Sequence, residues 1–386
     1  MIVEANGRIK KVDEAKSQHL LARGWKELKG ETLKEALFNK CISDDPEVNF
    51  LCVPEMSPDD EIYGYQIVYK TLQRGLAKHK IILAETSQDH CNHLHITPPY
   101  NTSAVIKPVR EGVKRGLLTM WETEEIYKHW AEPINESIDV VFVPATYLIE
   151  AFKNAGVTKP IELLPLGIQE QYFNYKERYY KKSDKFRLIH WNSGEPRKGY
   201  YELIEAWGKH FGDREDMELI LKHSTKTDPR HINLAFEHAG YEPHQFKNIT
   251  KINEPYTTDA MIELLHTCHA LIYPSCGEGY GYTPREAMAT GLPVIMTDEH
   301  SFKDIPADIF NPVKSSLAKA KRQYKDFEWY KPDVEDIATQ INKVMANYTK
   351  AKAKAKKAYS YVDKHEHIAD IITNILIPKL KQHELI

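Results

Sequence analysis

Two glutamates and three closely spaced glycines share one short segment, and their spacing suits a phosphorylated, hydroxyl-rich ligand. The glycines are Gly277, Gly279 and Gly281. They follow an apolar run that ends at Tyr273 and precede a helix pattern that begins at Pro284. Glycines let a backbone approach a ligand closely and expose its N–H groups. A helix N-terminus adds further donors and partial positive charge. The segment therefore predicts a binding site for a diphosphate.

The two glutamates could accept hydrogen bonds from the hydroxyl groups of such a ligand. Glu278 lies in the loop, where sugar hydroxyls could reach it, and Glu286 lies one turn into the helix, where ribose hydroxyls could. A local interpretation also exists, because Thr283-Pro-Arg-Glu286 has the pattern of a capping box with proline at the first helical position. The capping box explains Thr283 and Glu286, but neither Glu278 nor the glycines. Both interpretations of Glu286 stay open at this point.

These residues belong to a longer pattern, in which the two glutamates have E-x7-E spacing inside EGYGYTPREAMATGLPVI. The segment resembles the EGFGL-xxx-EAMA-xGxPVI signature of family 4 glycosyltransferases. The resemblance implies the GT-B fold and transfer with retained anomeric configuration. It also implies that Glu278 contacts the donor sugar and that Glu286 binds the nucleotide ribose. By the same resemblance, five backbone N–H groups face the sugar and the diphosphate: those of Gly279, Tyr280, Gly281, Tyr282 and Thr283.

Two adjacent cations, Arg197 and Lys198, precede another helix pattern. Their segment resembles the family's GR-xxxx-KG segment, which places an arginine and a lysine on the donor diphosphate. Lys198 and Gly199 match, whereas the family's arginine falls on Ser193. Either Arg197 takes over that charge or diphosphate binding depends more on Lys198. A solvated basic turn is the alternative, but two cations at the edge of a predicted cleft favour phosphate neutralisation.

The first half of the chain resembles the family more loosely. Gly64 lies in a polar loop similar to the family's N-terminal glycine loop, and we expect it near the donor. The stretch 118–124 occupies the place where many members carry a histidine, and it contains none. We expect Trp121, Glu122 and Thr123 to line the acceptor side.

A metal site at His93 and His95 is geometrically possible, because alternate residues of a strand share one face. Ordinary polar strand residues are the interpretation that we favour, because no second pair of ligands stands elsewhere. No DxD triplet occurs in the chain. We therefore predict no metal and no cofactor, with a nucleoside diphosphate sugar as co-substrate. Its charge would be neutralised by Arg197, Lys198 and a helix end.

Near-continuous apolar strands that alternate with helix patterns predict an α/β fold with parallel sheets covered on both faces. In the first half we expect strands at 50–53, 80–84, 94–97, 116–120, 140–143 and 161–164. In the second half we expect them at 186–190, 217–221, 249–252, 270–273 and 293–297. Ligands of such folds bind at the carboxyl ends of the strands, so we expect a cleft between two Rossmann-like halves.

We divide the chain into four parts. Residues 1–48 form a small accessory module, and 49–175 an N-terminal Rossmann-like acceptor domain. Residues 176–365 form a C-terminal Rossmann-like nucleotide-sugar domain, and 366–386 a C-terminal helix that packs back on the N-terminal domain. The accessory module has a strand pair that turns at Asn6-Gly7, a helix pattern over 13–22 and a returning strand at 25–28. It resembles short modules of phage structural proteins.

Composition narrows the class of protein. The chain has 386 residues, which suits two domains better than one core. Its net charge of −3 gives no global field that favours nucleic acid or anionic membranes. The basic stretches 350–357 and 314–325 indicate solvated helix faces in the first place, with a phosphate- or membrane-facing patch as the second interpretation. Five cysteines without a CxxC pair, no signal-peptide pattern and no apolar run of about 20 residues predict a cytoplasmic protein, in the host cytoplasm if it is viral.

The resemblance implies an enzyme, a glycosyltransferase of hexosyltransferase type, whose catalytic residues are Glu278, Lys198 and Arg197. Two alternatives remain: a GT-B sugar-nucleotide epimerase, and a non-catalytic phage or virion-associated binding protein. The donor partner is a nucleotide sugar. The sequence leaves open the acceptor, which could be a glycan, a lipid, a protein or a modified nucleic acid, and it leaves open the oligomeric state.

Overall fold

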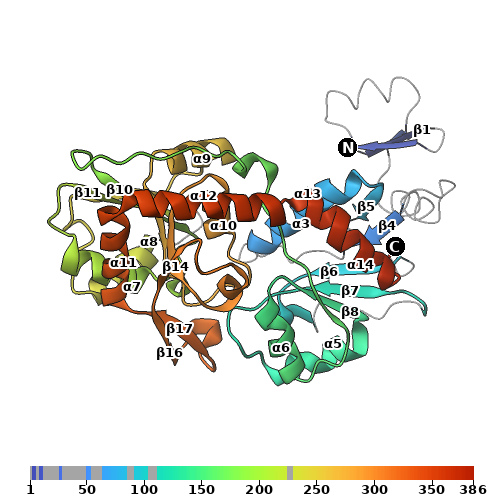
Figure 1. The fold of residues 1–386 in the computed structure, drawn as a ribbon. Coiled ribbons are helices and arrows are strands. Elements are labelled where there is room, and N and C mark those ends of the chain that lie inside the picture. Colours follow the sequence, from blue (N-terminus) through green and yellow to red (C-terminus); the bar gives the residue numbers. More distant parts are fainter. Residues whose placement is uncertain are drawn as a thin grey trace.

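The computed structural model describes residues 2–5, 8–11, 26–27, 49–53, 63–84, 91–102, 111–223 and 229–386. They form two α/β lobes and a small antiparallel sheet near the N-terminus (Figure 1). In that small sheet β1 (Ile2–Ala5) pairs with β2 (Arg8–Lys11) and with β3 (Lys26–Glu27). The strand pair and the returning strand are confirmed. The helix expected over 13–22 lies outside the described residues.

The first lobe is built on six parallel strands in the order β5-β4-β6-β7-β8-β9. The strands are β4 (Asn49–Cys52), β5 (Ile81–Ala84), β6 (His93–Ile96), β7 (Arg115–Leu118), β8 (Val140–Val143) and β9 (Ile161–Leu163). The helices are α3 (Tyr63–Ala77), α5 (Ala131–Ser137), α6 (Thr146–Asn154) and the short 3-10 helices η2 (Pro99–Asn101) and η3 (Lys128–Trp130). Strand β8 is buried along its whole length, because a parallel sheet is covered on both faces.

The second lobe repeats this plan, with parallel strands in the order β12-β11-β10-β13-β14-β15. The strands are β10 (Phe186–Asn192), β11 (Met217–His223), β12 (Ile249–Ile252), β13 (Ala270–Tyr273), β14 (Val294–Thr297) and β15 (Asn311–Val313). The helices are α7 (Tyr200–His210), α8 (Pro229–His238), α9 (Thr258–His266), α10 (Tyr282–Ala289) and α11 (Val334–Ala346). Short 3-10 helices are η4 (Glu170–Tyr172), η5 (Pro196–Lys198), η6 (His300–Asp304) and η7 (Arg322–Tyr324).

The predicted α/β class with two parallel sheets is confirmed, and every expected strand is present within a few residues of its predicted bounds. One expectation is wrong. The basic stretch 314–325 is not a helix face, because β16 (Ser315–Lys319) forms an antiparallel hairpin with β17 (Glu328–Pro332) and η7 lies between them. The pairing of two strands determines the secondary structure of this segment, and the number of lysines in it cannot reveal such pairing.

The last helices connect the lobes. Helix α12 (Tyr348–His365) runs along the second lobe (Figure 1). It buries Ala351, Ala355 and Ala358 and exposes Lys356 and Lys357, as expected of a solvated basic face. The chain continues through α13 (Ile368–Ile371), one π-helical turn η8 (Ile372–Leu376) and α14 (Ile377–Gln382). Apolar side chains of these helices share a core cluster with α3 and the first sheet.

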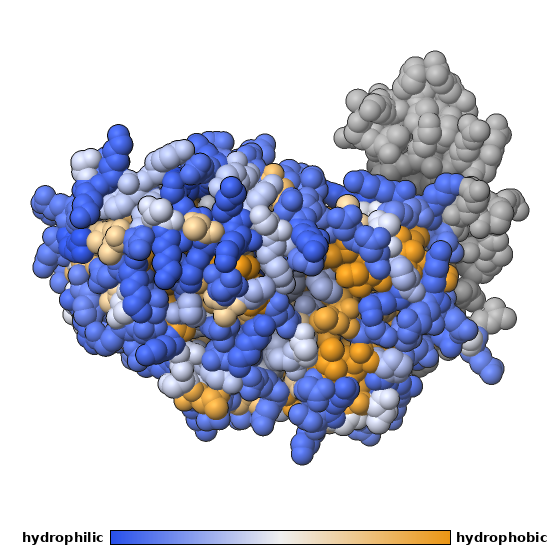
Figure 2. All heavy atoms as spheres, in the orientation of Figure 1, coloured by the Kyte–Doolittle hydropathy of each residue, from blue (hydrophilic) through white to orange (hydrophobic). Residues whose placement is uncertain are grey.

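The face over α12 is mostly hydrophilic, whereas apolar residues gather near α13 and the first lobe (Figure 2). The domain limits drawn above stay a proposal.

The two lobes meet at the carboxyl-terminal edges of their sheets. The N–H of Thr146, after β8, donates to Asp304 at 2.9 Å. The hydroxyl of Tyr147 donates to the carbonyl of Glu278 at 3.2 Å. Segments that follow strands of one sheet therefore contact segments that follow strands of the other, and we call this contact zone the seam.

Candidate active site

The candidate site lies where the loops after the neighbouring strands β10 and β13 cross. The first loop forms η5, which ends at Lys198, and the second carries Glu278. Gly199 follows with a left-handed φ of 77°, and a Cβ there would lie 1.9 Å from the carbonyl oxygen of Pro274. Only glycine fits this position. Gly199 thus allows the crossing that brings together two charged side chains 80 residues apart.

The carboxylate of Glu278 is the centre of a buried network. Lys198 Nζ donates to its two oxygens at 2.6 and 2.8 Å. The hydroxyls of Tyr273 and Ser275 donate to Oε1 at 2.9 and 2.8 Å. Burial alone would raise the pKa of Glu278, but Lys198 and Arg197 outweigh burial and lower that pKa to about 2. Burial, and then the charge of Arg197, lowers the pKa of Lys198. Glu278 is therefore an ionised, tightly held carboxylate at neutral pH.

The guanidinium of Arg197 is enclosed by carboxylates. It lies 2.8 Å from Glu195, 3.1 Å from Glu278 and 3.4 Å from Glu122, which belongs to the first lobe. It also donates to the carbonyl of Gly277 at 3.0 Å. Burial would lower the pKa of Arg197, but the three carboxylates raise it well above its ordinary value. Arg197 ties the lobes together, and a diphosphate would have to compete with these carboxylates for it.

Two glycines of the loop lie directly against the first lobe. A Cβ at Gly277 would lie 2.2 Å from the carbonyl oxygen of Glu122, and one at Gly279 would lie 2.8 Å from Cγ of Met120. Tyr65 fixes this opposing loop, because its hydroxyl accepts from the N–H of Met120 and donates to its carbonyl, both at 3.0 Å. The glycine-rich backbone therefore faces the seam, where the loop after β7 covers it in this conformation.

Helix α10 begins earlier than expected. Its first residue is Tyr282, its N-cap is Gly281 with a φ of 77°, and no side chain caps it. Thr283 is thus the second helical residue, and the capping-box interpretation is wrong because the left-handed Gly281 starts the helix before Thr283.

The carboxyl group of Glu286 makes no hydrogen bond or ion pair with any residue that the structure describes. Burial raises the pKa of Glu286 to about 8. This carboxyl is mostly protonated at neutral pH and can both donate and accept.

Three other residues expected near the donor lie in different surroundings. The hydroxyl of Tyr280 donates to Glu366 and accepts from the N–H of Gly167, so its side chain anchors the loop to the segment between the lobes. Ser193 is exposed directly after β10. Gly64 is the exposed second residue of α3 and not part of the expected loop, because the helix already starts at Tyr63. Donor binding by these residues stays a prediction.

The residues expected on the acceptor side are buried in the seam. Trp121 is 2% exposed, and its ring centroid lies 4.6 Å from that of Tyr324 in the second lobe. Glu122 accepts from the hydroxyl of Tyr324 at 2.7 Å, and burial raises the pKa of Glu122 despite the nearby Arg197. The hydroxyl of the buried Thr123 donates to a backbone carbonyl of its own loop. In this conformation these side chains hold the lobes together, and an acceptor role stays a prediction.

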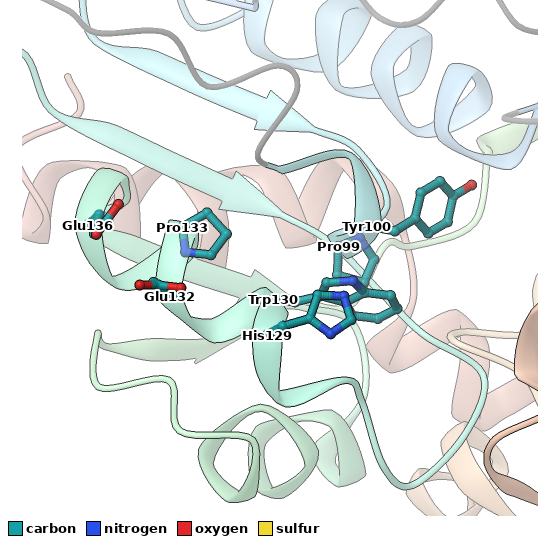
Figure 3. A pocket seen from close by; sticks show the side chains of 7 residues that line it. All are labelled: Pro99, Tyr100, His129, Trp130, Glu132, Pro133 and Glu136. Atoms are coloured by element: carbon teal, nitrogen blue, oxygen red, sulfur yellow. The ribbon is translucent and has the colours of Figure 1, made fainter.

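A cavity of about 340 Å³ opens on the first lobe (Figure 3). It is lined by Pro99, Tyr100, His129, Trp130, Glu132, Pro133 and Glu136. The ring of Tyr100 is 45% exposed, and the ring of Trp130 lies 4.9 Å from that of Trp121. Aromatic rings lie at one end of the cavity and carboxylates at the other (Figure 3). Such a surface can contact both the apolar face and the hydroxyl groups of a sugar.

The residues considered for a metal do not form a metal site in the described part of the chain. His93 and His95 are both buried on β6, with ring centroids 5.6 Å apart. Burial lowers the pKa of His95 to about 3. No cluster of three or more His, Cys, Asp or Glu side chains suited to a metal ion occurs among the described residues. The neighbouring Asp89 and His90 lie outside them.

The sequence interpretation missed several partners of this network. Tyr273 and Ser275 stand in the glycine-rich segment itself and could have been included as hydroxyl donors to Glu278. Tyr147, His300 and Tyr324 reach the seam from three separate elements, and no local pattern marks them.

Comparisons with known proteins agree with this architecture. Residues 171–361 match the family model described as glycosyl transferases group 1. HepE of Anabaena in complex with UDP-glucose aligns with a TM-score of 0.63 and 11% identity, covering 86% of this chain and 99% of that one. A glycosyltransferase from Rickettsia africae aligns with a TM-score of 0.58 and 16% identity, covering 88% of this chain and 99% of that one. The UDP-forming α,α-trehalose-phosphate synthase from Burkholderia xenovorans aligns with a TM-score of 0.54 and 9% identity, covering 81% of this chain and 76% of that one. No curated protein matches the sequence. Within the described residues, no helix is both long and apolar enough to span a bilayer.

Proposed function

We propose, from the premise that this chain is a glycosyltransferase with the GT-B fold, that it moves a hexosyl group from a nucleoside diphosphate sugar to an acceptor hydroxyl. Transfer retains the anomeric configuration and needs no metal ion. The observation that carries the proposal is the buried pairing of Lys198 with Glu278 beside the glycine-rich loop. The lysine can neutralise a diphosphate, and the carboxylate can accept hydrogen bonds from sugar hydroxyls. The HepE structure holds UDP-glucose, which supports a donor of this class.

The proposed reaction breaks the bond between the anomeric carbon and the diphosphate oxygen. A bond from the same carbon to the acceptor oxygen forms on the same face, and the acceptor proton passes to an oxygen of the departing diphosphate. Negative charge grows on that diphosphate, where Lys198, Arg197 and the N–H groups that begin α10 can stabilise it. A carboxylate with a pKa of about 2 is a weak nucleophile, so Glu278 is poorly suited to a double displacement.

Donor binding exchanges contacts within the buried network. Lys198 and Arg197 both contact Glu278, and a diphosphate offers them replacement oxygens. As the phosphates take the cations, oxygens of Glu278 become available to a sugar hydroxyl. Glu286 would receive the ribose, because its mostly protonated carboxyl, which has no partner among the described residues, can exchange hydrogen bonds with two neighbouring hydroxyls.

Metal independence is proposed from the residues that surround the diphosphate position. Two cationic side chains and a helix N-terminus supply the positive charge that a bound divalent ion would otherwise supply. We expect EDTA to leave activity unchanged. An activity that EDTA abolishes and Mg²⁺ or Mn²⁺ restores would contradict this part of the proposal.

The acceptor would enter through the cavity lined by Tyr100 and Trp130, because the ring of Trp121 connects it to the seam. Tyr100→Ala should raise the KM for the acceptor and leave donor binding unchanged. Tyr179→Ala removes a ring that is 71% exposed on the second lobe and serves as the control. Equal acceptor KM values in both variants would contradict this placement.

Donor hydrolysis tests the proposed function without knowledge of the acceptor, because water can replace the acceptor. The protein is incubated with UDP-, GDP- and ADP-sugars, and the released sugar is followed by proton NMR before its anomers equilibrate. We expect one α-linked donor to give the α-anomer first. Initial release of the β-anomer would contradict retention, and no binding of any nucleotide sugar in thermal-shift measurements would contradict the function.

A further inference from the structure

His300 has a backbone conformation that histidine rarely adopts. It is the first residue of η6, which follows β14 after a short connection, and it has a φ of 53°. Left-handed backbone is uncommon outside glycine and costs on the order of 1 kcal/mol for a side chain of this size. Residues held in this way persist where the surrounding structure fixes them, often at functional sites.

The imidazole ring of His300 is enclosed within the seam. It is 2% exposed and lies between two tyrosine rings, with centroids 5.1 Å from Tyr147 of the first lobe and 5.1 Å from Tyr330 of β17. Its Cε1 atom would lie 3.4 Å from a Cβ built on Gly277, the residue before Glu278. The ring therefore lies against the glycine-rich loop, next to Glu278.

Neither ring nitrogen of His300 has a hydrogen-bond partner among the described residues. Burial lowers the pKa of His300 to about 4, although Glu278 acts in the opposite direction, so the imidazole is neutral near pH 7. A neutral imidazole has one donor and one acceptor. Leaving buried polar groups without partners costs about 1–3 kcal/mol each. A phenylalanine or leucine could contact the two tyrosines without this cost, so packing alone does not account for a histidine.

We propose that His300 is a specificity-determining residue that binds a hydroxyl group of the transferred sugar. The inference rests on the proposed function, because it needs a sugar beside Glu278. A hydroxyl group is both donor and acceptor, and it matches the two free functions of a neutral imidazole. The position against Gly277 places the ring next to the carboxylate that is proposed to contact the same sugar. The left-handed backbone is then the conformation that turns the ring toward the loop.

The test separates recognition of the sugar from recognition of the nucleotide. Calorimetry would measure the affinities of the full chain for UDP-glucose, UDP-N-acetylglucosamine, GDP-mannose and ADP-glucose. Each affinity would be compared with that for the matching sugar-free nucleotide, which is UDP, GDP or ADP. The donor with the largest gain over its sugar-free nucleotide would then be titrated into His300→Asn and His300→Gly, which both tolerate left-handed backbone. Lys80→Gly relieves a similar φ of 60° far from the seam and is the matched control.

We expect both His300 variants to bind the sugar-free nucleotide as the wild type does, and to lose the sugar-dependent gain by roughly 3- to 10-fold. Lys80→Gly should keep the whole gain. Melting temperatures of all variants show whether they are folded. A full gain in folded His300→Asn or His300→Gly would overturn the inference and leave the proposed function intact. A wild type that binds no sugar nucleotide would overturn both.

Discussion

The Nζ atom of Lys198 lies 2.6 Å from Oε1 of Glu278, and both side chains are more than nine-tenths buried. A buried ion pair of this kind contributes little net stability, because desolvation offsets attraction, yet removal of one partner leaves an uncompensated charge. The pair is therefore better explained by the ligand that it can receive than by the stability of the fold.

The first prediction uses this asymmetry. Lys198→Met or Glu278→Gln alone should lower the free energy of unfolding by roughly 3–5 kcal/mol, and each should abolish sugar transfer. The double variant should recover most of the stability while remaining inactive. Urea denaturation and a donor-hydrolysis assay measure the two effects. A double variant as unstable as the single variants, or one that is active, would be inconsistent with a functional buried pair.

The second prediction concerns the contact of Arg197 with Glu122 across the seam. Glu122→Ala removes one carboxylate that competes with a diphosphate for the guanidinium, and Glu195 and Glu278 remain to pair with it. We expect UDP to bind roughly 3- to 10-fold more tightly, as one charge-assisted contact would allow.

The control for this prediction is Glu124→Ala. Glu124 also accepts a bond across the lobes, from the hydroxyl of Tyr330, but at an exposed position, where such contacts contribute little. UDP affinity should not change there. Weaker UDP binding by Glu122→Ala would instead mean that Glu122 holds Arg197 ready for the ligand.

The third prediction isolates the crossing of the two loops. Gly199 and Gly240 have nearly the same φ, 77° and 78°, but a Cβ at Gly199 meets Pro274 whereas one at Gly240 meets nothing within 4 Å. Gly240→Ala should cost about 1 kcal/mol, from backbone strain alone. Gly199→Ala should cost roughly 3 kcal/mol or more, because an overlap with backbone is added. Equal melting temperatures for the two variants would show that the loops can separate freely.

Much of the fold follows from local patterns in the sequence. Strands such as β8 and β13 are continuous apolar runs, and the crossing of Lys198 with Glu278 follows once both lie after adjacent parallel strands. The start of α10 was misplaced because the conformation of Gly281 overrides the capping pattern at Thr283.

The contact of Arg197 with Glu122 and the position of His300 could not be predicted from local sequence. They depend on how two lobes meet, and side chains distant in the chain form those contacts. The hairpin of β16 and β17 was missed for a related reason, because only the pairing of the two strands defines it.

The fourth prediction concerns pH. Burial gives Glu286 a folded-state pKa of about 8, above its ordinary 4.5. Protonation of Glu286 therefore makes its full contribution to the free energy of unfolding below pH 4.5. This contribution is lost as the pH rises through 8. Glu286→Gln keeps a neutral group at every pH. Its melting temperature should equal that of the wild type at pH 5 and exceed it at pH 9. A difference that does not change between these pH values would contradict the raised pKa.

The most direct measurement is a crystal structure of the protein with the nucleotide sugar that binds it most tightly. We expect Lys198 Nζ within hydrogen-bond distance of a phosphate oxygen, and a carboxylate oxygen of Glu278 released from the lysine to a sugar hydroxyl. A nucleotide sugar bound elsewhere, with Lys198 still on Glu278 at its present distance, would contradict the account.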